Sequence, residues 1–334
     1  MKQHWWMAIA AFLAIGSPAR ADHPVATGAG GDGATLNVAS PDTLEAGRAA
    51  IGMRLTYTRP EQRSDAELAA FAARHVHAHN NDYLLNAVVG VSYGLTDRLT
   101  ISAELPYRRQ DGLRAGEHSH AGGSVSNEAV ELGSVSGIGD VSLVARYGLL
   151  AEGPMRLALI GGLKLPTGGT DKKSDQGERL ETEHQPGSGS WDPIAGAAIA
   201  TDLGPVTLSA SALYQFSGEG AQETELGDRA QVGVALSRHI GAEHHEDAPG
   251  DEHGHASWDV FLELTGEWEG RQQIAGETEE DSGGRVVWLS PGARFNSAGG
   301  WSVAAAIGLP VWQDIGLSHP DNEYRLTMAL GRAF

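Results

Sequence analysis

Histidines gather in three short stretches of this 334-residue chain, and imidazole is a side chain that transition metals bind readily at neutral pH. The first stretch places His75, His77 and His79 at alternate positions, with Asp82 shortly after them. In an extended segment the three rings would lie on one side, about 7 Å apart, so two of them could meet one ion. Asp82 could supply a carboxylate. This stretch is a candidate metal-binding segment.

The second stretch holds His118 and His120, and the third alternates imidazoles with carboxylates. The histidines of the third stretch are His244, His245, His253 and His255. The chain has no cysteine, so thiolate ligands are excluded. We expect no required cofactor and at most weak binding of Zn, Cu or Ni by flexible loops. The alternative is that these are solvated polar loops in which histidine is incidental, as we take the single residues His23, His184 and His319 to be.

The elements that must position these histidines show a two-residue side-chain period. In residues 324–334, Tyr324, Leu326 and Met328 fall on one face, while Arg325 and Thr327 fall on the other. One face suits lipid and the other a wet lumen. The segment stops on a C-terminal phenylalanine, which is typical of the closing strand of an outer-membrane barrel, and we expect the barrel-assembly machinery to be its partner.

About twelve segments alternate in this way, an even number, as bacterial single-chain barrels require. They cover residues 51–58, 85–93, 99–107, 141–147, 157–165, 193–201, 206–216, 230–236, 258–264, 287–295, 303–311 and 324–334. The predicted fold is all-β: a transmembrane antiparallel β-barrel of about 12 strands over residues 44–334. A soluble β-sandwich is the alternative, because it alternates in the same way.

The connections between these segments alternate in length. Residues 94–97, 148–154, 202–205 and 296–300 are short, while residues 59–82, 110–137 and 167–191 are long. Short turns belong to the periplasm and long loops to the exterior. Residues 238–257 are periplasmic by this count yet form a long, acidic, histidine-rich connection, so either this loop is unusual or the count is off by one strand.

Within the first long loop, a short helix precedes the histidines. Ser64 and Glu67 form a capping box, and Leu68, Phe71 and Ala72 would share one face. Such a helix could fold at the mouth of the barrel and hold His75, His77 and His79 there.

The N-terminus indicates export. Residues 1–21 join Lys2 to a short apolar run and an Ala-Arg-Ala cleavage signal, which predicts a signal peptide and an outer-membrane location. Residues 22–43 are then expected to be a flexible segment. The formal charge of -19 becomes about -21 when Lys2 and Arg20 are removed, so nucleic acid is not an expected partner and outer-membrane lipid is.

Charged side chains fall on the lumenal face of several predicted strands. They are Arg54, Glu104, Arg146, Arg156, Lys164, Glu263, Arg294 and Arg325. A positive lining would favour anions over metal cations. Alternatively, arginines and carboxylates pair across a narrow lumen and partly plug it. No serine and histidine face each other on the outer wall, so we expect no lipolytic activity and no enzyme.

Several glycine-bearing motifs mark the junctions between strands and loops. They are 93–99 (YGLTDRL), 105–107 (LPY), 137–140 (GIGD), 163–168 (LKLPTG) and 187–192 (GSGSWD). The chain resembles in these motifs the meta-pathway phenol-degradation (MetA-type) outer-membrane transporter family, over about residues 44–334. The resemblance implies a twelve-strand barrel and outer-membrane transport of a small solute, and it leaves the substrate open.

Two functions follow from these observations. The first is an outer-membrane channel or transporter for small solutes, linked to transition metals through histidine-rich loops. The second is a surface barrel that does not transport and that displays metal-binding or adhesive loops.

Overall fold

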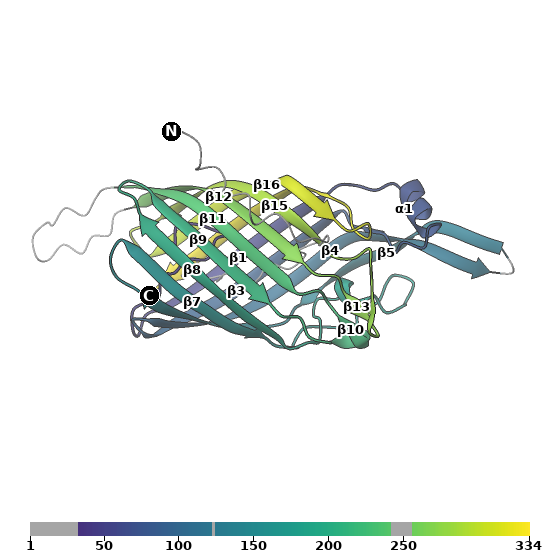
Figure 1. Ribbon diagram of the computed structural model, residues 1–334, viewed down its shortest axis with the longest axis horizontal. Coiled ribbons are helices and arrows are strands. Elements are labelled where there is room, and N and C mark those ends of the chain that lie inside the picture. The colour runs from purple at the N-terminus through teal and green to yellow at the C-terminus, as the bar shows by residue number, and fades with distance from the viewer. Residues whose placement is uncertain (1–32, 122–123, 242–255) are drawn as a thin grey trace, which may run out of the picture.

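The computed structural model describes residues 33–121, 124–241 and 256–334, and these form one antiparallel β-barrel (Figure 1). Twelve strands close the barrel. Two further strands, β2 (His79–Asn80) and β5 (Ser124–Ile138), each pair with β4 (Leu99–Ala121). The twelve are β1 (Ala49–Pro60), β3 (Tyr83–Thr96), β4 (Leu99–Ala121), β6 (Ser142–Leu150), β7 (Met155–Lys164), β8 (Asp192–Asp202), β9 (Thr207–Gln215), β11 (Arg229–Ile240), β12 (Ser257–Glu269), β15 (Gly284–Asn296), β16 (Trp301–Ile315) and β17 (Asn322–Ala333).

The barrel closes through pairings at both edges of the sheet. β1 pairs with β17 from Ala50 opposite Ala333 onward, and the first part of β4 pairs with β6 from Leu99 opposite Tyr147. Closure leaves no unpaired edge within the wall, as a lipid environment requires. The predicted transmembrane barrel and its strand number are confirmed. Within the described residues, no helix has the length and apolarity needed to span a bilayer.

Side-chain burial alternates along the wall as the sequence predicted. On β17, Leu326, Met328 and Leu330 are exposed, whereas Arg325 and Thr327 are buried. The same alternation runs through β11 and β12. Exposure of large apolar side chains over the whole outer wall suits contact with lipid acyl chains.

The two ends of the barrel differ, as Figure 1 shows. The base holds the C-terminus and the short turns, such as the turn from Thr96 to Leu99. β11 ends and β12 begins at the base, where Ile240 lies opposite Trp258. The strand count is therefore right, and the connection 241–256 leaves from the same end as the C-terminus. Its residues 242–255 lie outside the described residues.

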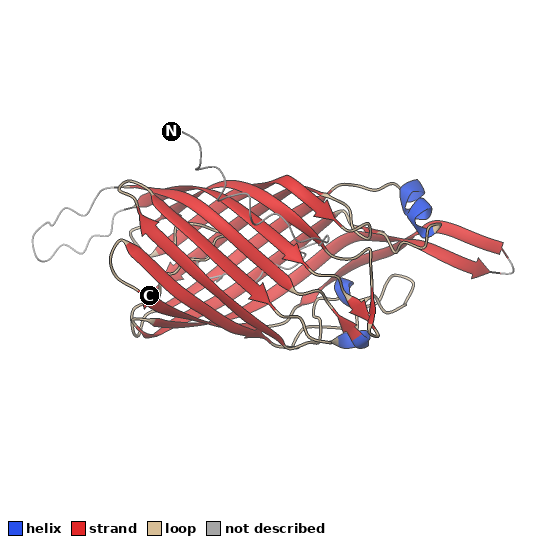
Figure 2. Ribbon diagram, in the orientation of Figure 1, coloured by secondary structure: helices blue, strands red, loops and turns tan. Residues whose placement is uncertain are grey.

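The mouth at the other end carries the long connections (Figure 2). The long connection over residues 110–137 is here, but it has a regular structure that the sequence did not predict. β4 continues to Ala121 and pairs with β5 in a hairpin that projects beyond the wall. This hairpin extends beyond the lipid-facing wall and packs in part against α1, so its sequence lacks the apolar alternation that marks the other strands.

Short elements fill the remaining connections at the mouth. The predicted helix is present as α1 (Asp65–Ala72), with the capping box of Ser64 and Glu67, and Leu68 packs beside the hairpin. The other short elements are η2 (Thr182–His184), η3 (Ala221–Glu223), β10 (Thr224–Glu225), β13 (Gln273–Ile274) and β14 (Glu277–Thr278).

Candidate functional site

The lumen is occupied by the start of the described chain. Residues 33–43, called here the lumenal segment, run beside the buried face of the wall, and residues 35–41 are all buried. Leu36 packs with Phe261 of β12 and Ala329 of β17. We expected residues 22–43 to be flexible, and for 33–43 the structure shows an ordered segment instead. The sequence of this segment has neither a strand nor a helix period, so it did not predict that the segment lies in the lumen.

One carboxylate anchors the lumenal segment. Glu263 of β12 is fully buried, and its Oε1 accepts hydrogen bonds from the backbone N–H groups of Leu36, Asn37 and Val38 at 2.8, 2.6 and 3.1 Å. Its Oε2 accepts a fourth from Asn37 Nδ2 at 2.6 Å. Hydrogen bonds to an ionised group are stronger than neutral ones, so the four together fix this stretch of backbone.

Arginine side chains from other strands also bind the lumenal segment. Arg54 donates to Asn37 Oδ1 at 2.7 Å, and Arg294 donates to the carbonyl of Thr35 at 3.0 Å. Nearer the base, Arg156 lies 2.7 Å from a carboxylate oxygen of Asp42. The lumenal segment is thus held from several sides of the barrel.

The predicted lumen-lining residues lie inside the barrel. Arg54, Glu104, Arg146, Glu263, Arg294 and Arg325 are buried, and Arg156 and Lys164 are partly buried. Arg325 lies 2.7 Å from Glu267 Oε1. Lys164, Arg325 and Arg156 each have an acidic partner, which agrees with the alternative of charges paired across a narrow lumen. A cavity of about 90 Å³ beside Lys164 and Arg108 is small compared with ordinary ligand pockets.

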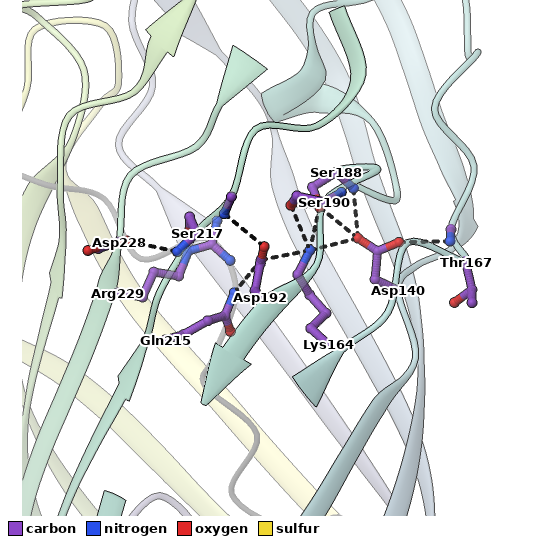
Figure 3. Close-up of polar contacts among 12 residues, drawn as sticks. Asp140, Lys164, Thr167, Ser188, Ser190, Asp192, Gln215, Ser217, Asp228 and Arg229 are labelled. Atoms are coloured by element: carbon purple, nitrogen blue, oxygen red, sulfur yellow. Dashed lines mark hydrogen bonds and ion pairs between the residues drawn. The ribbon is translucent and has the colours of Figure 1, made fainter. Parts of the chain in front are cut away.

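Three motifs of the family resemblance, 137–140, 163–168 and 187–192, meet at the rim of the wall nearer the mouth (Figure 3). Lys164, at the end of β7, lies 2.9 Å from Asp140 and 2.8 Å from Asp192, and it also contacts Ser188 and Ser190. Asp140 in turn accepts from the backbone N–H groups at 168 and 188, both at 2.8 Å. Residues far apart in sequence therefore form one polar network around a single ammonium group.

Two glycines, Gly168 and Gly187, allow two backbone segments of this rim to approach each other closely. A Cβ on Gly168 would lie 2.7 Å from the Cα of Gly187, and the converse distance is 2.6 Å. Burial raises the pKa of Asp140, but Lys164 and the backbone N–H groups outweigh it and lower the pKa overall. The carboxylate is therefore the stable form of Asp140.

A second polar cluster lies at the mouth, and we call it the mouth cluster. It consists of His79, Glu181, Glu183, His184 and His319. His79 Nδ1 lies 3.1 Å from Glu183 Oε1, and His184 Nε2 lies 3.3 Å from the same oxygen. His79 Nε2 lies 3.6 Å from Glu181, and His319 Nε2 lies 3.5 Å from Glu183 Oε2.

The mouth cluster joins three separate connections. His79 is in β2, which pairs with β4 at Ala115. Glu183 and His184 are in η2, and His319 follows β16. The three histidines are each less than a tenth exposed. Burial and the neighbouring His79 lower the pKa of His184 well below 6.5; burial raises the pKa of Glu183, but the adjacent histidines hold it well below 4.5.

The other predicted histidines divide into two groups. His75, His77 and His118 line a pocket of about 410 Å³ beside the mouth cluster, and the rings of His75 and His118 are 4.5 Å apart. His75 and His77 are exposed whereas His79 is buried, so the three do not share one face. His244, His245, His253 and His255 lie outside the described residues, as does the side chain of His120.

The structure gives His79 other carboxylate neighbours than Asp82 and brings together two histidines that we took to be incidental. Asp82 is exposed, and its carbonyl oxygen accepts from Arg59 at 2.7 Å; the carboxylates beside His79 are Glu181 and Glu183. His184 and His319 are not incidental, since both lie within 3.5 Å of Glu183. Single histidines in different loops carry no spacing signal, so the sequence could not group them.

Comparison with known proteins places the chain in a family. A family model described as "Putative MetA-pathway of phenol degradation" matches residues 39–314, which is most of the chain. The chain belongs to this family. The family resemblance drawn from the rim motifs is thereby confirmed. No curated protein gives a sequence match.

Two solved structures are similar to this family member. An outer membrane channel from Pseudomonas putida is 20% identical with a TM-score of 0.55, and the match covers 90% of this chain and 100% of that one. LpxR from Salmonella typhimurium is 12% identical with a TM-score of 0.42, covering 85% and 99%. The first likeness agrees with the fold described above, an outer-membrane type of barrel.

Proposed function

We propose that this protein is an outer-membrane channel for small solutes whose lumen is closed by its own lumenal segment. The observation that carries the proposal is that Glu263, inside the polar lumen, accepts hydrogen bonds from three successive backbone N–H groups of the lumenal segment. A peptide held by hydrogen bonds can exchange those bonds for water and leave, whereas a strand of the wall cannot. The relative from Pseudomonas putida is described as an outer membrane channel, which supports the same role.

The paired charges of the lumen support a small and polar solute. Arg325 faces Glu267 and Arg156 faces Asp42, so the lining has no large excess of one sign at these positions. A channel lined in this way would discriminate by size more than by charge. The family description mentions phenol degradation, which would be compatible with small aromatic acids or alcohols.

A link to transition metals belongs to the same proposal. His75, His77 and His118 line the open pocket at the mouth, where they could take up Zn, Cu or Ni ions weakly from outside. His244, His245, His253 and His255 would do the same in the periplasm, because the connection that carries them leaves from the base.

The route to the membrane is also proposed. Residues 1–21 would act as a signal peptide, and the barrel-assembly machinery would recognise the strand that ends at Phe334. In the membrane, the exposed apolar side chains of the wall would contact lipid. We propose no enzymatic activity.

Single-channel recording in planar bilayers tests the proposed function. A mature variant lacking residues 33–42 should conduct at least severalfold more than the full mature chain, because the lumen loses its occupant. Glu263→Gln should open more often, since it removes the charge that binds the N–H groups of Leu36, Asn37 and Val38. Glu323→Gln is the matched control, because this side chain is 45% exposed at the mouth. If the shortened variant stays closed at all voltages, the barrel does not transport and the surface-display alternative stands.

A further inference from the structure

We propose that the mouth cluster is a binding site for one divalent transition-metal ion, with His79, Glu181, Glu183 and His184 as its four ligands. The four residues each offer one donor atom, and these atoms all lie within 4.8 Å of one another. Donors bound to one zinc ion at about 2.0–2.2 Å stand about 3.4 Å apart. His79 can bind one ion through only one of its ring nitrogens. With Nδ1 as that donor, His79 Nδ1 and His184 Nε2 lie 3.1 and 3.3 Å from Glu183 Oε1, which is already close to that value.

A buried imidazole without a hydrogen bond points to a ligand. His184 is 3% exposed, and neither of its ring nitrogens has a hydrogen-bond partner in the described structure. Its Nε2 faces Glu183 Oε1, and its ring meets that of His79 edge to face at 4.5 Å. Burying an unsatisfied polar ring costs free energy, and coordination of a metal ion would remove this cost.

A second layer of contacts holds the ligands in place. Arg108 of β4 donates to the carbonyl oxygens of Glu183 at 2.9 Å and Gln185 at 3.3 Å, on the same turn as His184. The side chain of Gln185 binds the backbone of Lys172 and Leu180. His319 contacts the second oxygen of Glu183 and would orient that carboxylate, as outer partners commonly do in metal sites.

The donor set selects the class of ion. Two imidazoles and two carboxylates suit Zn, Cu, Co or Ni, whereas Mg²⁺ and Ca²⁺ prefer oxygen ligands alone. We take Zn²⁺ as the ion, because four nitrogen and oxygen donors are its usual number. The open pocket lined by His75, His77 and His118 adjoins His79 and His184 and gives the ion a path from outside.

Binding would tie two mouth connections together. His79 comes from the segment after α1, and the other three ligands come from the connection between β7 and β8. This role rests on the proposed link of the mouth to metals and does not require the lumen to conduct. Equilibrium binding therefore tests it separately from conductance.

The test measures Zn²⁺ binding by calorimetry and metal analysis on the full mature protein in detergent, purified without a histidine tag. All proteins carry His244, His245, His253 and His255 changed to Ala, so that the periplasmic connection contributes nothing. We expect one equivalent of Zn²⁺, no competition from excess Mg²⁺, and at least a hundredfold weaker binding in His184→Ala. His319→Gln should weaken binding roughly 10- to 100-fold. The matched control is His239→Ala, because this exposed histidine of β11 lies at the base of the barrel and its loss should leave the mouth cluster intact.

Two readouts guard against a misfolded variant. Glu181→Gln changes a partly exposed ligand, and heat-modifiable migration in gels would show that its barrel is folded. Co²⁺ bound to the parent protein should give the visible spectrum of a four-coordinate ion, and that spectrum should change in Glu181→Gln. Equal Zn²⁺ affinity in the parent and His184→Ala, or a Co²⁺ spectrum that stays six-coordinate, would overturn the proposal.

Discussion

At the scale of single residues, Lys164 shows how the rim depends on one charge. Its ammonium group is 12% exposed and lies within 3 Å of two buried carboxylates, Asp140 and Asp192. Removing one partner of a buried ion pair leaves an uncompensated charge, which costs far more than the pair itself contributes. The network in Figure 3 should therefore respond sharply to loss of this lysine.

We expect Lys164→Met to lower the free energy of unfolding by about 3–5 kcal/mol, because two carboxylates then face each other without a cation. Urea titration of the barrel in lipid vesicles measures this value. Lys173→Met is the control, since this lysine is exposed on the neighbouring connection and should change stability by less than about 0.5 kcal/mol. A loss as small as the control's would mean that Lys164 does not hold the rim.

At the scale of elements, α1 depends on its N-terminal cap. Ser64 and Glu67 exchange hydrogen bonds, and Leu68 packs against Val76 and Ala78. Hydrogen bonds from the backbone N–H and the hydroxyl of Ser64 lower the pKa of Glu67 below 4.5. A depressed carboxyl pKa means that the cap stabilises the helix at pH values above 4.5 and that this support is lost as the pH falls through the lowered pKa.

Hydrogen exchange of the α1 amides, corrected for intrinsic rates, should show this dependence. Protection should fall between pH 6 and pH 3.5 in the wild type, whereas Glu67→Gln should be less protected at pH 6 and nearly independent of pH. Glu61→Gln, outside the capping box, should behave as the wild type. An unchanged profile in Glu67→Gln would show that the charge of Glu67 is not the source of the pH dependence.

At the scale of the whole molecule, the strand order places each described connection at one of the two ends of the barrel, and each end should face one side of the membrane. The C-terminus and the turn at Ser297 lie at the base, and β13 and β14 lie at the mouth (Figure 1). β11 ends at the base, so Gly241 should face the periplasm even though a histidine-rich stretch follows it. Metal handling by that stretch would then concern ions already inside the periplasm.

Because the chain has no cysteine, single introduced cysteines can report these sides. In intact cells, an impermeant maleimide should label Glu277→Cys at the mouth and should leave Gly241→Cys and Ser297→Cys unlabelled. After the outer membrane is made permeable, all three should react. Labelling of Gly241→Cys in intact cells would place the β11–β12 connection outside and contradict the strand order.

The twelve strands could be predicted because lipid imposes a regular pattern. Leu326, Met328 and Leu330 alternate with Arg325 and Thr327, and no other environment requires this over so many segments. The same logic missed the β4–β5 hairpin. That hairpin extends beyond the lipid-facing wall and is covered in part by α1 and by Leu180, so its burial depends on tertiary contacts and its sequence shows no regular apolar alternation.

The sequence by itself therefore determined the barrel, its family and the helix at the mouth, because each depends on residues that are close along the chain. The tertiary structure decided what fills the lumen and which histidines meet. Glu263 reaches Asn37 across more than two hundred residues, and His79, His184 and His319 come from three connections. Such contacts exist only once the wall has closed and brought the loops of the mouth together, so no local spacing could reveal them.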